Sequence, residues 1–404
     1  MWAPHAIHAT VMPMKQDSFQ PQLSPEFVIN ALRLPPSAVT LHRKPGPAAE
    51  DPARRPFTAI SIDSRKIPAG CLFVAIAGEK HDGHSFIDAA VRAGAAGVLY
   101  RKGFAVEIPA PVHQYRVDDT QEAFRQLSGR WRREFSLPVI AVAGSNGKTT
   151  TKELLAAILG GRFPQVLKTL GSQNGFLGIP LTLMGLRPEH GAAVIEVGID
   201  ELGAMEKHMT LVGASASVLT SIGPEHLEKL RDVPTVAREE SFAFSALSSS
   251  GQGHGGLVAV NLDDPWIRPH WATLKGVRRV GYTLAPDRLP SGIDREAGDE
   301  FLIGEVKGTE LLVRGRAFPA TAFGLPLPGR HNASNLLAAV AVASGLGLTP
   351  DEIQRGLAGF RGAAGRSEVV TTAEGTIVVC DYYNASPPSV VAGLEVLCEL
   401  AAAG

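Results

Sequence analysis

The residue types best suited to chemistry are grouped at positions 144–150, which read Gly-Ser-Asn-Gly-Lys-Thr-Thr. An apolar, β-branched run at 137–143 predicts a buried strand before this group, and a helical run opens at Thr149 after it. The glycine turn and the positive end of the helix dipole point backbone N–H groups at one spot. Lys148 adds a charge for the outer phosphates, and the Thr149 hydroxyl suits Mg²⁺. The segment therefore predicts binding of ATP or GTP and phosphoryl chemistry.

This motif is shorter than the full phosphate loop G-x-x-x-x-G-K-[ST], because the first glycine of that pattern falls at Val142. The sequence carries G-x-x-G-K-T instead. The alternative interpretation is an ordinary strand–turn–helix connection with a lysine on the surface. Strand, turn, lysine, hydroxyl and helix occur here in the order that a phosphate site needs, and this order favours the phosphate site.

Three further polar residues stand near predicted strand ends. Glu196 lies in the predicted strand 192–198, where a carboxylate beside the phosphate strand suits Mg²⁺; the alternative is a salt-bridged strand end. His226 follows the predicted strand 216–221 and could ligate a second metal, although a lone histidine is more often structural. Asn174 lies in a glycine-rich loop that could wrap a substrate, or it is a turn residue.

Two later segments carry candidate nucleotide contacts. His331 and Asn332 lie in a loop that enters a predicted helix at 335–345 and could contact a base, while Asn335 could cap the helix. Asp381 directly follows a predicted buried strand at 376–380, where a carboxylate can accept hydrogen bonds from ribose hydroxyls. The competing interpretations are a plain helix cap and a turn rich in turn-forming residues.

The elements that must position these groups predict an α/β protein of several domains. A single strand and helix at its C-terminal end cannot bury a core of their own, so we expect only the beginning of a third domain there. The predicted parts are a disordered leader at 1–20, a small α/β domain at 21–136, a central doubly wound, mostly parallel domain at 137–365, and an incomplete Rossmann-like domain at 366–404. The predicted central strands are 138–143, 192–198, 216–221 and 257–261.

Bulk composition excludes several classes of protein. The 404 residues are 45% hydrophobic and 20% charged with a net charge of −1, so no basic surplus points to nucleic acid. The apolar runs are shorter than a membrane span. Three cysteines without metal or disulfide spacing, and an N-terminus without a secretory signal pattern, predict a cytoplasmic location.

Taken in order, the motifs resemble the Mur ligase family of cell-wall synthesis across almost the whole chain. The family's phosphate loop, Gly-x-x-Gly-Lys-Thr/Ser, matches 144–149, and its metal glutamate and histidine match Glu196 and His226. Its Gly-Arg-His-Asn-x-x-Asn motif matches 329–335. In the first unit, Asp-Ser-Arg at 63–65, Pro-x-Gly-x-Leu-Phe-Val-Ala at 68–75 and Asp-Gly-His-x-Phe at 82–86 are similar to the family's UDP-sugar-binding domain.

The resemblance implies an ATP-dependent amide ligation in peptidoglycan synthesis. ATP would phosphorylate the terminal carboxylate of a UDP-N-acetylmuramoyl-tripeptide, and the amine of D-alanyl-D-alanine would attack the acyl phosphate. The sequence Asp-Tyr-Tyr-Asn-Ala-Ser-Pro at 381–387 is similar to that of the family member that adds D-alanyl-D-alanine, and it favours that member over the one that adds a diamino acid. Two more interpretations stay open: a folylpolyglutamate-type ligase, against which the UDP-sugar-type first unit argues, and a truncated, catalytically dead nucleotide-binding protein.

The resemblance also implies roles for single residues, and we expect the protein to be a monomer. The implied catalytic residues are Lys148, Glu196 and His226. The implied ATP contacts are Gly144, Ser145, Asn146, Gly147, Lys148, Thr149 and Thr150, with Asn332 at the adenine and Asp381 at the ribose. The implied Mg²⁺ ligands are Thr149, Glu196 and His226, and the implied UDP-substrate contacts are Ile62, Ser64 and Asn174.

The sequence departs from the family pattern in two places. The family carries a carbamoylated lysine on the helix after the histidine motif, and Glu240 stands at that position here. A carbamate is a carboxylate on a long arm, so we hypothesise that Glu240 supplies the negative group directly to the metal site. In addition, most of the third domain is missing, which would leave an acyl phosphate open to water and the chain inactive or only partly competent.

Overall fold

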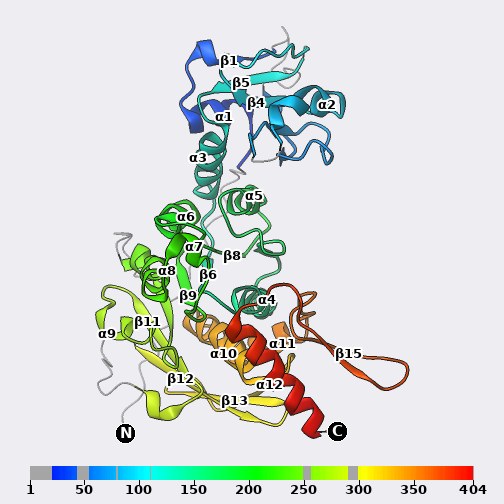
Figure 1. The fold of residues 1–404 in the computed structure, drawn as a ribbon. Helices are drawn as coiled ribbons and strands as arrows, with labels where there is room; N and C mark the ends of the chain where they lie inside the picture. The colour runs from blue at the N-terminus through cyan, green and yellow to red at the C-terminus, as the bar shows by residue number, and fades with distance from the viewer. Residues whose placement is uncertain are drawn as a thin grey trace.

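The computed structural model describes residues 21–42, 54–78, 81–109, 111–248, 256–289 and 299–403. The expected leader at 1–20 lies outside these residues. The described residues form three sheets, and each sheet falls within one of the three predicted domains (Figure 1). The mixed α/β fold predicted from the sequence is confirmed, while the domain boundaries stay predictions.

The N-terminal part is a five-stranded sheet of order β1-β5-β4-β3-β2, in which the strands run parallel except β1. Helix α1 begins as its sequence predicts, because the Ser24 hydroxyl accepts a hydrogen bond from the backbone N–H of Phe27. The elements are α1 (Pro25–Leu32), β1 (Val39–Thr40), β2 (Ile60–Ser61), β3 (Leu72–Val74), α2 (Ile87–Arg92), β4 (Gly97–Arg101) and β5 (His113–Val117).

Helix α3 (Thr120–Arg132) joins this sheet to the central part (Figure 1). It packs against α1 on one side and against α5 (Gly178–Met184) and α6 (Ala204–Val212) on the other. The buried Arg132 guanidinium donates hydrogen bonds to the carbonyl groups of Val212 and Gly213. These contacts fix the helix against the central part of the molecule.

The central sheet has nine strands among the described residues, in the order β14-β13-β12-β11-β10-β9-β6-β8-β7. The strands from β12 to β7 run parallel, and β13 and β14 are antiparallel additions at one edge. The strands are β6 (Val139–Ala143), β7 (Val166–Lys168), β8 (Ala192–Glu196), β9 (Ala216–Leu219), β10 (Leu257–Asn261), β11 (Arg278–Thr283), β12 (Glu300–Lys307), β13 (Glu310–Gly315) and β14 (Thr321–Gly324).

Helices cover both faces of this sheet, and alternate residues of β6 face each layer. Ile140 and Val142 pack toward α4 (Lys148–Leu159) and α10 (Arg330–Gly345). Val139, Ala141 and Ala143 pack toward the layer of α3, α5 and α6. Every residue of β6 is buried, as a central parallel strand requires. The remaining helices are α7 (Leu227–Leu230), α8 (Val233–Ser248), α9 (His270–Thr273) and α11 (Pro350–Leu357).

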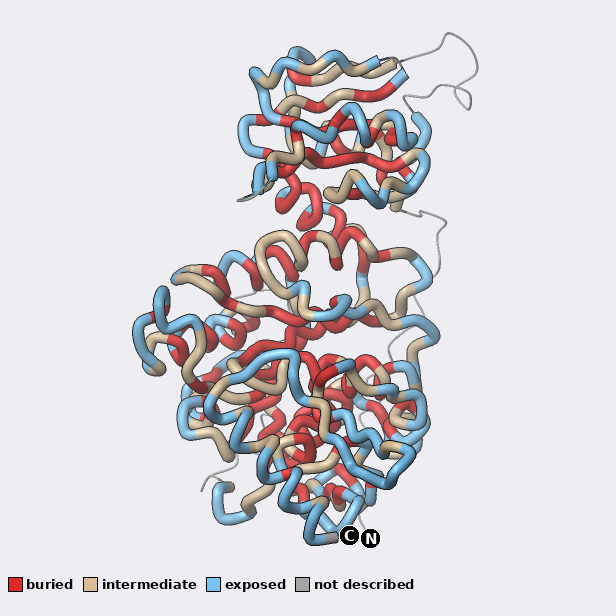
Figure 2. Tube along the Cα trace, turned by 45° about the vertical axis from the view of Figure 1, so that its right-hand side comes forward, coloured by how far each residue is buried: buried red, intermediate tan, exposed pale blue. Residues whose placement is uncertain are grey.

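The C-terminal segment forms a hairpin of β15 (Glu368–Thr371) and β16 (Ile377–Cys380), followed by α12 (Pro387–Ala403). The sequence predicted β16 and the helix but not β15. Most of these residues are exposed, in contrast to the buried central strands (Figure 2). None of the helices in the described ranges is long and apolar enough to cross a lipid bilayer.

Candidate functional site

The glycine turn lies between β6 and α4, at the carboxyl end of a strand flanked by β8 and β9. Helix α4 begins at Lys148, one residue earlier than the sequence predicted. Two glycines are required by the geometry, because both have positive φ and no room for a side chain. A Cβ on Gly144 would lie 2.6 Å from Thr220 Oγ1, and a Cβ on Gly147 would lie 2.4 Å from Asn335 Oδ1.

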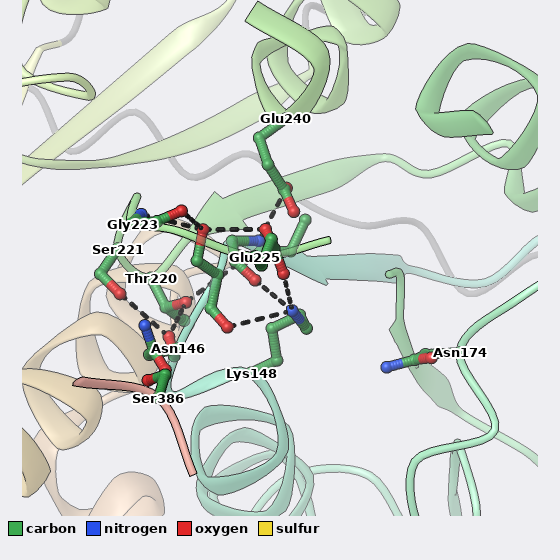
Figure 3. A network of polar contacts seen from close by, with 12 residues as sticks. Asn146, Lys148, Asn174, Thr220, Ser221, Gly223, Glu225, Glu240 and Ser386 are labelled. Carbon is green, nitrogen blue, oxygen red and sulfur yellow. Dashed lines mark hydrogen bonds and ion pairs between the residues drawn. The ribbon is translucent and has the colours of Figure 1, made fainter. Parts of the chain in front are cut away.

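Lys148 meets a carboxylate that the sequence did not single out. Its Nζ donates to the Gly144 carbonyl and lies 3.3 Å from Glu225 Oε2, while Glu225 Oε1 accepts a 2.8 Å hydrogen bond from the Ser145 hydroxyl (Figure 3). Burial lowers the pKa of Lys148, but Glu225 and the other nearby carboxylates outweigh it and raise the pKa. Glu225 could have been considered from the sequence, because it follows a predicted strand and stands next to His226. Only His226 of this segment is among the predicted site residues.

Glu240 reaches the same turn from α8. Its side chain is fully buried, and its Oε2 accepts a 2.8 Å hydrogen bond from the Gly144 backbone N–H (Figure 3). Its Oε1 has no hydrogen-bond partner among the described residues. Burial, together with the neighbouring Glu225 carboxyl group, raises the pKa of Glu240 well above its usual range. The structure thus places this carboxylate against the phosphate loop.

Glu196 ends β8 and is 1% exposed. Its Oε1 accepts a 2.8 Å hydrogen bond from Asn174 Nδ2, and its Oε2 lies 3.4 Å from the Nζ of the fully buried Lys152. That oxygen accepts no hydrogen bond from the described part of the chain. Asn174, expected at the UDP substrate, therefore lies at the predicted metal carboxylate. The two interpretations of Glu196, a salt-bridged strand end and a metal ligand, are compatible.

The loop that carries Asn174 also contacts the start of α4. The Gly171 carbonyl accepts a hydrogen bond from Lys152, and the Ser172 hydroxyl lies 3.3 Å from Thr149 Oγ1. The loop between β7 and α5 therefore connects Thr149, Lys152 and Glu196.

These groups fit Mg²⁺ held jointly with a nucleotide. No three His, Cys, Asp or Glu side chains within the described ranges are grouped closely enough to hold a metal by themselves. Mg²⁺ in nucleotide sites takes one or two carboxylates and completes its shell with phosphate and water oxygens. Glu196 and Glu240 each have one buried oxygen that accepts no hydrogen bond from the described residues, and these oxygens and the Thr149 hydroxyl are ligands of this kind.

His226, predicted as a metal ligand, has a partly exposed side chain. Its side chain is 47% exposed, and its Nδ1 lies 3.6 Å from the Glu228 carboxylate. Its φ of 46° is unusual for a residue other than glycine, and such strained positions cluster at functional sites. In this structure Glu225, rather than His226, reaches the phosphate loop.

We expect replacement of Lys152 by methionine to lower the free energy of unfolding by about 3–5 kcal/mol, because Glu196 would stay buried without its cation. Chemical denaturation followed by tryptophan fluorescence measures this change. The control is Lys168→Met, since Lys168 pairs with Glu153 in the same network but is 45% exposed. The Lys168→Met substitution should lower the free energy of unfolding by less than about 1 kcal/mol. Equal midpoints for the two variants would contradict the assignment of Lys152 as the essential counter-charge.

A cavity of about 300 Å³ opens beside the phosphate loop, between the start of α10 and the C-terminal segment. Helix α10 begins at Arg330 and not at Asn335, which corrects the prediction, so His331 and Asn332 lie in its first turn. Asn335 is inside the helix rather than at its cap, and its Oδ1 lies 3.3 Å from Thr151 Oγ1. Of the predicted ATP contacts, the cavity lining contains Asn146, Gly147, Thr149, Thr150, Asn332 and Asp381.

Arg366 completes this cavity from the C-terminal segment, and the sequence did not reveal it. Its Nη2 lies 3.5 Å from Thr149 Oγ1, and its guanidinium lies over the ring of Tyr383, 4.1 Å from the centroid. Its Nε is buried without a partner in the described residues. Nearby, the Ser386 hydroxyl donates to Asn146 Oδ1 at 3.0 Å (Figure 3). An arginine in a glycine-rich connection gives no sequence signal, because only the fold brings it to the loop.

The predicted UDP-substrate residues lie in another part of the molecule. Ile62 and Ser64 are partly buried and follow β2 in the N-terminal sheet, away from α4 and α10 (Figure 1). The Asp63 and Arg65 side chains hold this turn with two hydrogen bonds of 2.9 Å, and this pairing lowers the pKa of Asp63 to about 2. The structure therefore separates these residues from the phosphate loop.

Comparison with known proteins assigns the chain to a family. The model of the Mur ligase middle domain matches residues 142–343, and that of the Mur ligase family, catalytic domain, matches residues 56–132. The UDP-N-acetylmuramoyl-tripeptide–D-alanyl-D-alanine ligase of Escherichia coli K12 is 34% identical over 343 residues, which cover 85% of this chain and 72% of the relative. The ligase of the same name from Bacillus subtilis is 31% identical over 83% of this chain and 69% of its own length.

Solved structures agree with this assignment. A crystal structure of MurF from Acinetobacter baumannii superposes with a TM-score of 0.75 at 27% sequence identity, covering 94% of this chain and 77% of that one. The two family models match most of the N-terminal sheet, from β2 to β5, and the segment that carries the phosphate loop. This chain belongs to the Mur ligase family.

Proposed function

We propose that this chain is an ATP-dependent ligase that joins D-alanyl-D-alanine to UDP-N-acetylmuramoyl-tripeptide through an acyl phosphate. The relatives from Escherichia coli and Bacillus subtilis carry the name of this activity. The observation that carries the proposal is the cavity in which the phosphate loop, the start of α10 and Asp381 meet. That arrangement provides a place for the phosphates, the base and the ribose of one nucleotide.

The chain's own residues have distinct roles in this proposal. Lys148 and the loop N–H groups bind the outer phosphates, and Arg366 faces the same phosphates from the C-terminal segment. Asn332 contacts the adenine, and the exposed Asp381 accepts from the ribose hydroxyls. In-line transfer to a peptide carboxylate needs charge neutralisation and fixed orientation, and these groups supply both.

Thr149, Glu196 and Glu240 would hold Mg²⁺. When bound, the ion neutralises charge on the transferring phosphoryl group. His226, the neighbour of Glu225 in the chain, stays a proposed contact on the acyl-phosphate side. The hydrogen bond from Asn174 to Glu196 favours a role for Asn174 in orienting this carboxylate over a role at the sugar nucleotide.

The N-terminal sheet would bind the uridine nucleotide through the turn that contains Ile62 and Ser64. This places the two ends of a long substrate in two parts of the chain: the UDP at the first sheet and the peptide carboxylate at the phosphate loop. A monomer in the cytoplasm is part of the same proposal.

We expect replacement of Glu240 by glutamine to raise the Mg²⁺ concentration for half-maximal activity about tenfold, because one carboxylate beside the phosphate loop is lost. Glutamine keeps the size and can still accept from the Gly144 N–H. Titration of phosphate release with Mg²⁺ measures the effect, with Glu239→Gln as the control, since Glu239 is buried on the same helix but accepts from Met205 N. An unchanged Mg²⁺ requirement would rule out this role for Glu240.

Phosphate release tests the reaction itself. Purified chain is incubated with MgATP and UDP-N-acetylmuramoyl-tripeptide, with and without D-alanyl-D-alanine. Turnover that requires the dipeptide supports the proposal. Turnover with a diamino acid on the preceding nucleotide substrate supports the diamino-acid-adding ligase instead. Nucleotide binding without turnover on either substrate supports a catalytically dead nucleotide-binding protein.

A further inference from the structure

Glu225 places a negative charge inside the phosphate-binding turn. Its side chain is 13% exposed; Oε2 lies 3.3 Å from Lys148 Nζ, and Oε1 accepts from the Ser145 hydroxyl at 2.8 Å (Figure 3). A lysine and a hydroxyl of a phosphate loop are groups that bind the oxygens of an anion. In this structure a carboxylate of the chain itself makes those contacts.

The loop that carries Glu225 is fixed to the turn by independent hydrogen bonds. The Ser145 N–H donates to the Ser221 carbonyl at 2.7 Å, and the Gly223 N–H donates to Ser145 Oγ at 2.9 Å. The Ser145 hydroxyl also lies 3.0 Å from the Gly223 carbonyl. One of these contacts joins the two backbones and two use the Ser145 hydroxyl. Together they hold the loop that carries Glu225 beside the turn that carries Lys148.

A nucleotide that binds to this turn must compete with that carboxylate. Lys148 has three N–H groups, and it donates to the Gly144 carbonyl and approaches both the Ser145 carbonyl and Glu225. Terminal phosphates would approach an ammonium group that is already neutralised, and they would meet Glu225 as a like charge at short range. Binding therefore includes the separation of Lys148 from Glu225.

We propose that Glu225 is a positioning residue that holds Lys148 as an internal counter-anion in the nucleotide-free protein and that the terminal phosphates of the nucleotide displace it. This inference rests on the proposed nucleotide site and goes beyond it, because it assigns a competing group within that site. The Glu225 carboxylate keeps the Lys148 side chain at the turn before ATP binds, and this pairing lowers the affinity for the nucleotide. Glu225 acts through Lys148 and does not touch the reacting atoms.

Calorimetric titration with ADP in EDTA tests the inference without a contribution from metal ligation. Glu225→Gln removes the charge and keeps the shape, and it should tighten ADP binding at least about fivefold. The control is Glu228→Gln in the same segment, which removes the same charge from a side chain that is 70% exposed and paired only with His226 in the described contacts. Its ADP affinity should equal that of the unmodified chain within twofold.

The titration distinguishes displacement of Glu225 by the nucleotide from a purely structural role of Glu225. Tighter ADP binding by Glu225→Gln alone supports the displacement, while equal or weaker binding overturns it and leaves the nucleotide site intact. If Glu225→Gln does not fold, Glu225→Asp, whose shorter side chain cannot keep both contacts, should show an intermediate gain, and no gain again overturns the inference. If the unmodified chain binds ADP only when Mg²⁺ is present, the same comparison of variants is made with Mg²⁺. Failure of the unmodified chain to bind ADP under either condition would instead contradict the proposed function itself.

Discussion

Replacement of Lys148 by methionine should lower the rate of phosphate release at least about 10³-fold, the largest effect expected of any single substitution in this chain. Methionine keeps the length and the apolar part of the side chain and removes only the ammonium group. Lys148 is the first residue of α4, between Gly147 and Thr149, which line the cavity. In the proposed reaction, positive charge there would stabilise the transferring phosphoryl group more than the bound ground state.

The substitution also leaves Glu225 and Glu240 without their cation, so a loss of folding must be separated from a loss of catalysis. The double variant Lys148→Met with Glu225→Gln removes the negative charge that pairs directly with Lys148, and it should recover melting temperature without restoring the rate. Lys307→Met is a suitable control because Lys307 is exposed on the β12–β13 hairpin. A rate within tenfold of the unmodified chain in a well-folded Lys148 variant would refute its proposed role.

Replacement of Arg366 by alanine should lower the rate about 10²–10³-fold while ADP binds with an affinity within about threefold of the unmodified chain. Arg366 approaches the Thr149 hydroxyl at the phosphate end of the cavity, so its charge should act mainly on the transferring group. The guanidinium stacks on Tyr383, and its Nε has no partner among the described residues, so it is held in place with capacity for another acceptor.

The matched control for this variant is Arg361→Ala in the same connection, because Arg361 donates only to the carbonyl groups of Ala358 and Phe360 in the contacts described. Its rate should stay within twofold of the unmodified chain. Equal losses in both variants would show that the connection matters as a whole and that Arg366 has no specific role at the phosphates. A parallel loss of ADP affinity in Arg366→Ala would move its role to nucleotide binding.

The parallel strands around the phosphate loop could be predicted because burial on both faces makes them continuous apolar runs. The predicted strands 138–143 and 257–261 correspond to β6 and β10. Strand β13 alternates in burial, β12 ends in three exposed residues, and both strands include charged residues, so no continuous apolar run revealed them. The short edge strand β7 has only partly buried and exposed residues and gave no signal for the same reason.

Site residues that are neighbours in the sequence could be predicted, and those that only the fold brings together could not. The phosphate loop could be predicted because its residues are contiguous and each has a separate chemical reason to be there. Arg366 could not be predicted, because it becomes a candidate only when folding brings it to Thr149. Glu225 follows a predicted strand, but only the fold shows that this carboxylate reaches Lys148. The start of α10 was placed late because Gly329, with a φ of 96° and no side-chain cap, precedes a helix whose first turn carries no sequence signal of a capping residue.

The C-terminal segment illustrates a further limit of sequence interpretation. The sequence predicted one strand and one helix there, too few elements to bury a core, and most residues of the observed hairpin and helix are exposed. Sequence alone did not show that this segment lies against the nucleotide cavity, where Ser386 contacts Asn146 and Arg366 approaches Thr149. Its contribution to the site comes from these few contacts and not from a core of its own.

The central claim is that the turn ending in Lys148 binds a nucleoside triphosphate in a magnesium-dependent way. Isothermal titration of the folded chain with a non-hydrolysable ATP analogue and Mg²⁺ tests it most directly. We predict one site with a dissociation constant between about 1 μM and 1 mM, weakened at least tenfold in Lys148→Met and weakened when Mg²⁺ is removed. The absence of magnesium-dependent binding by the well-folded chain would contradict the claim and every role derived from it.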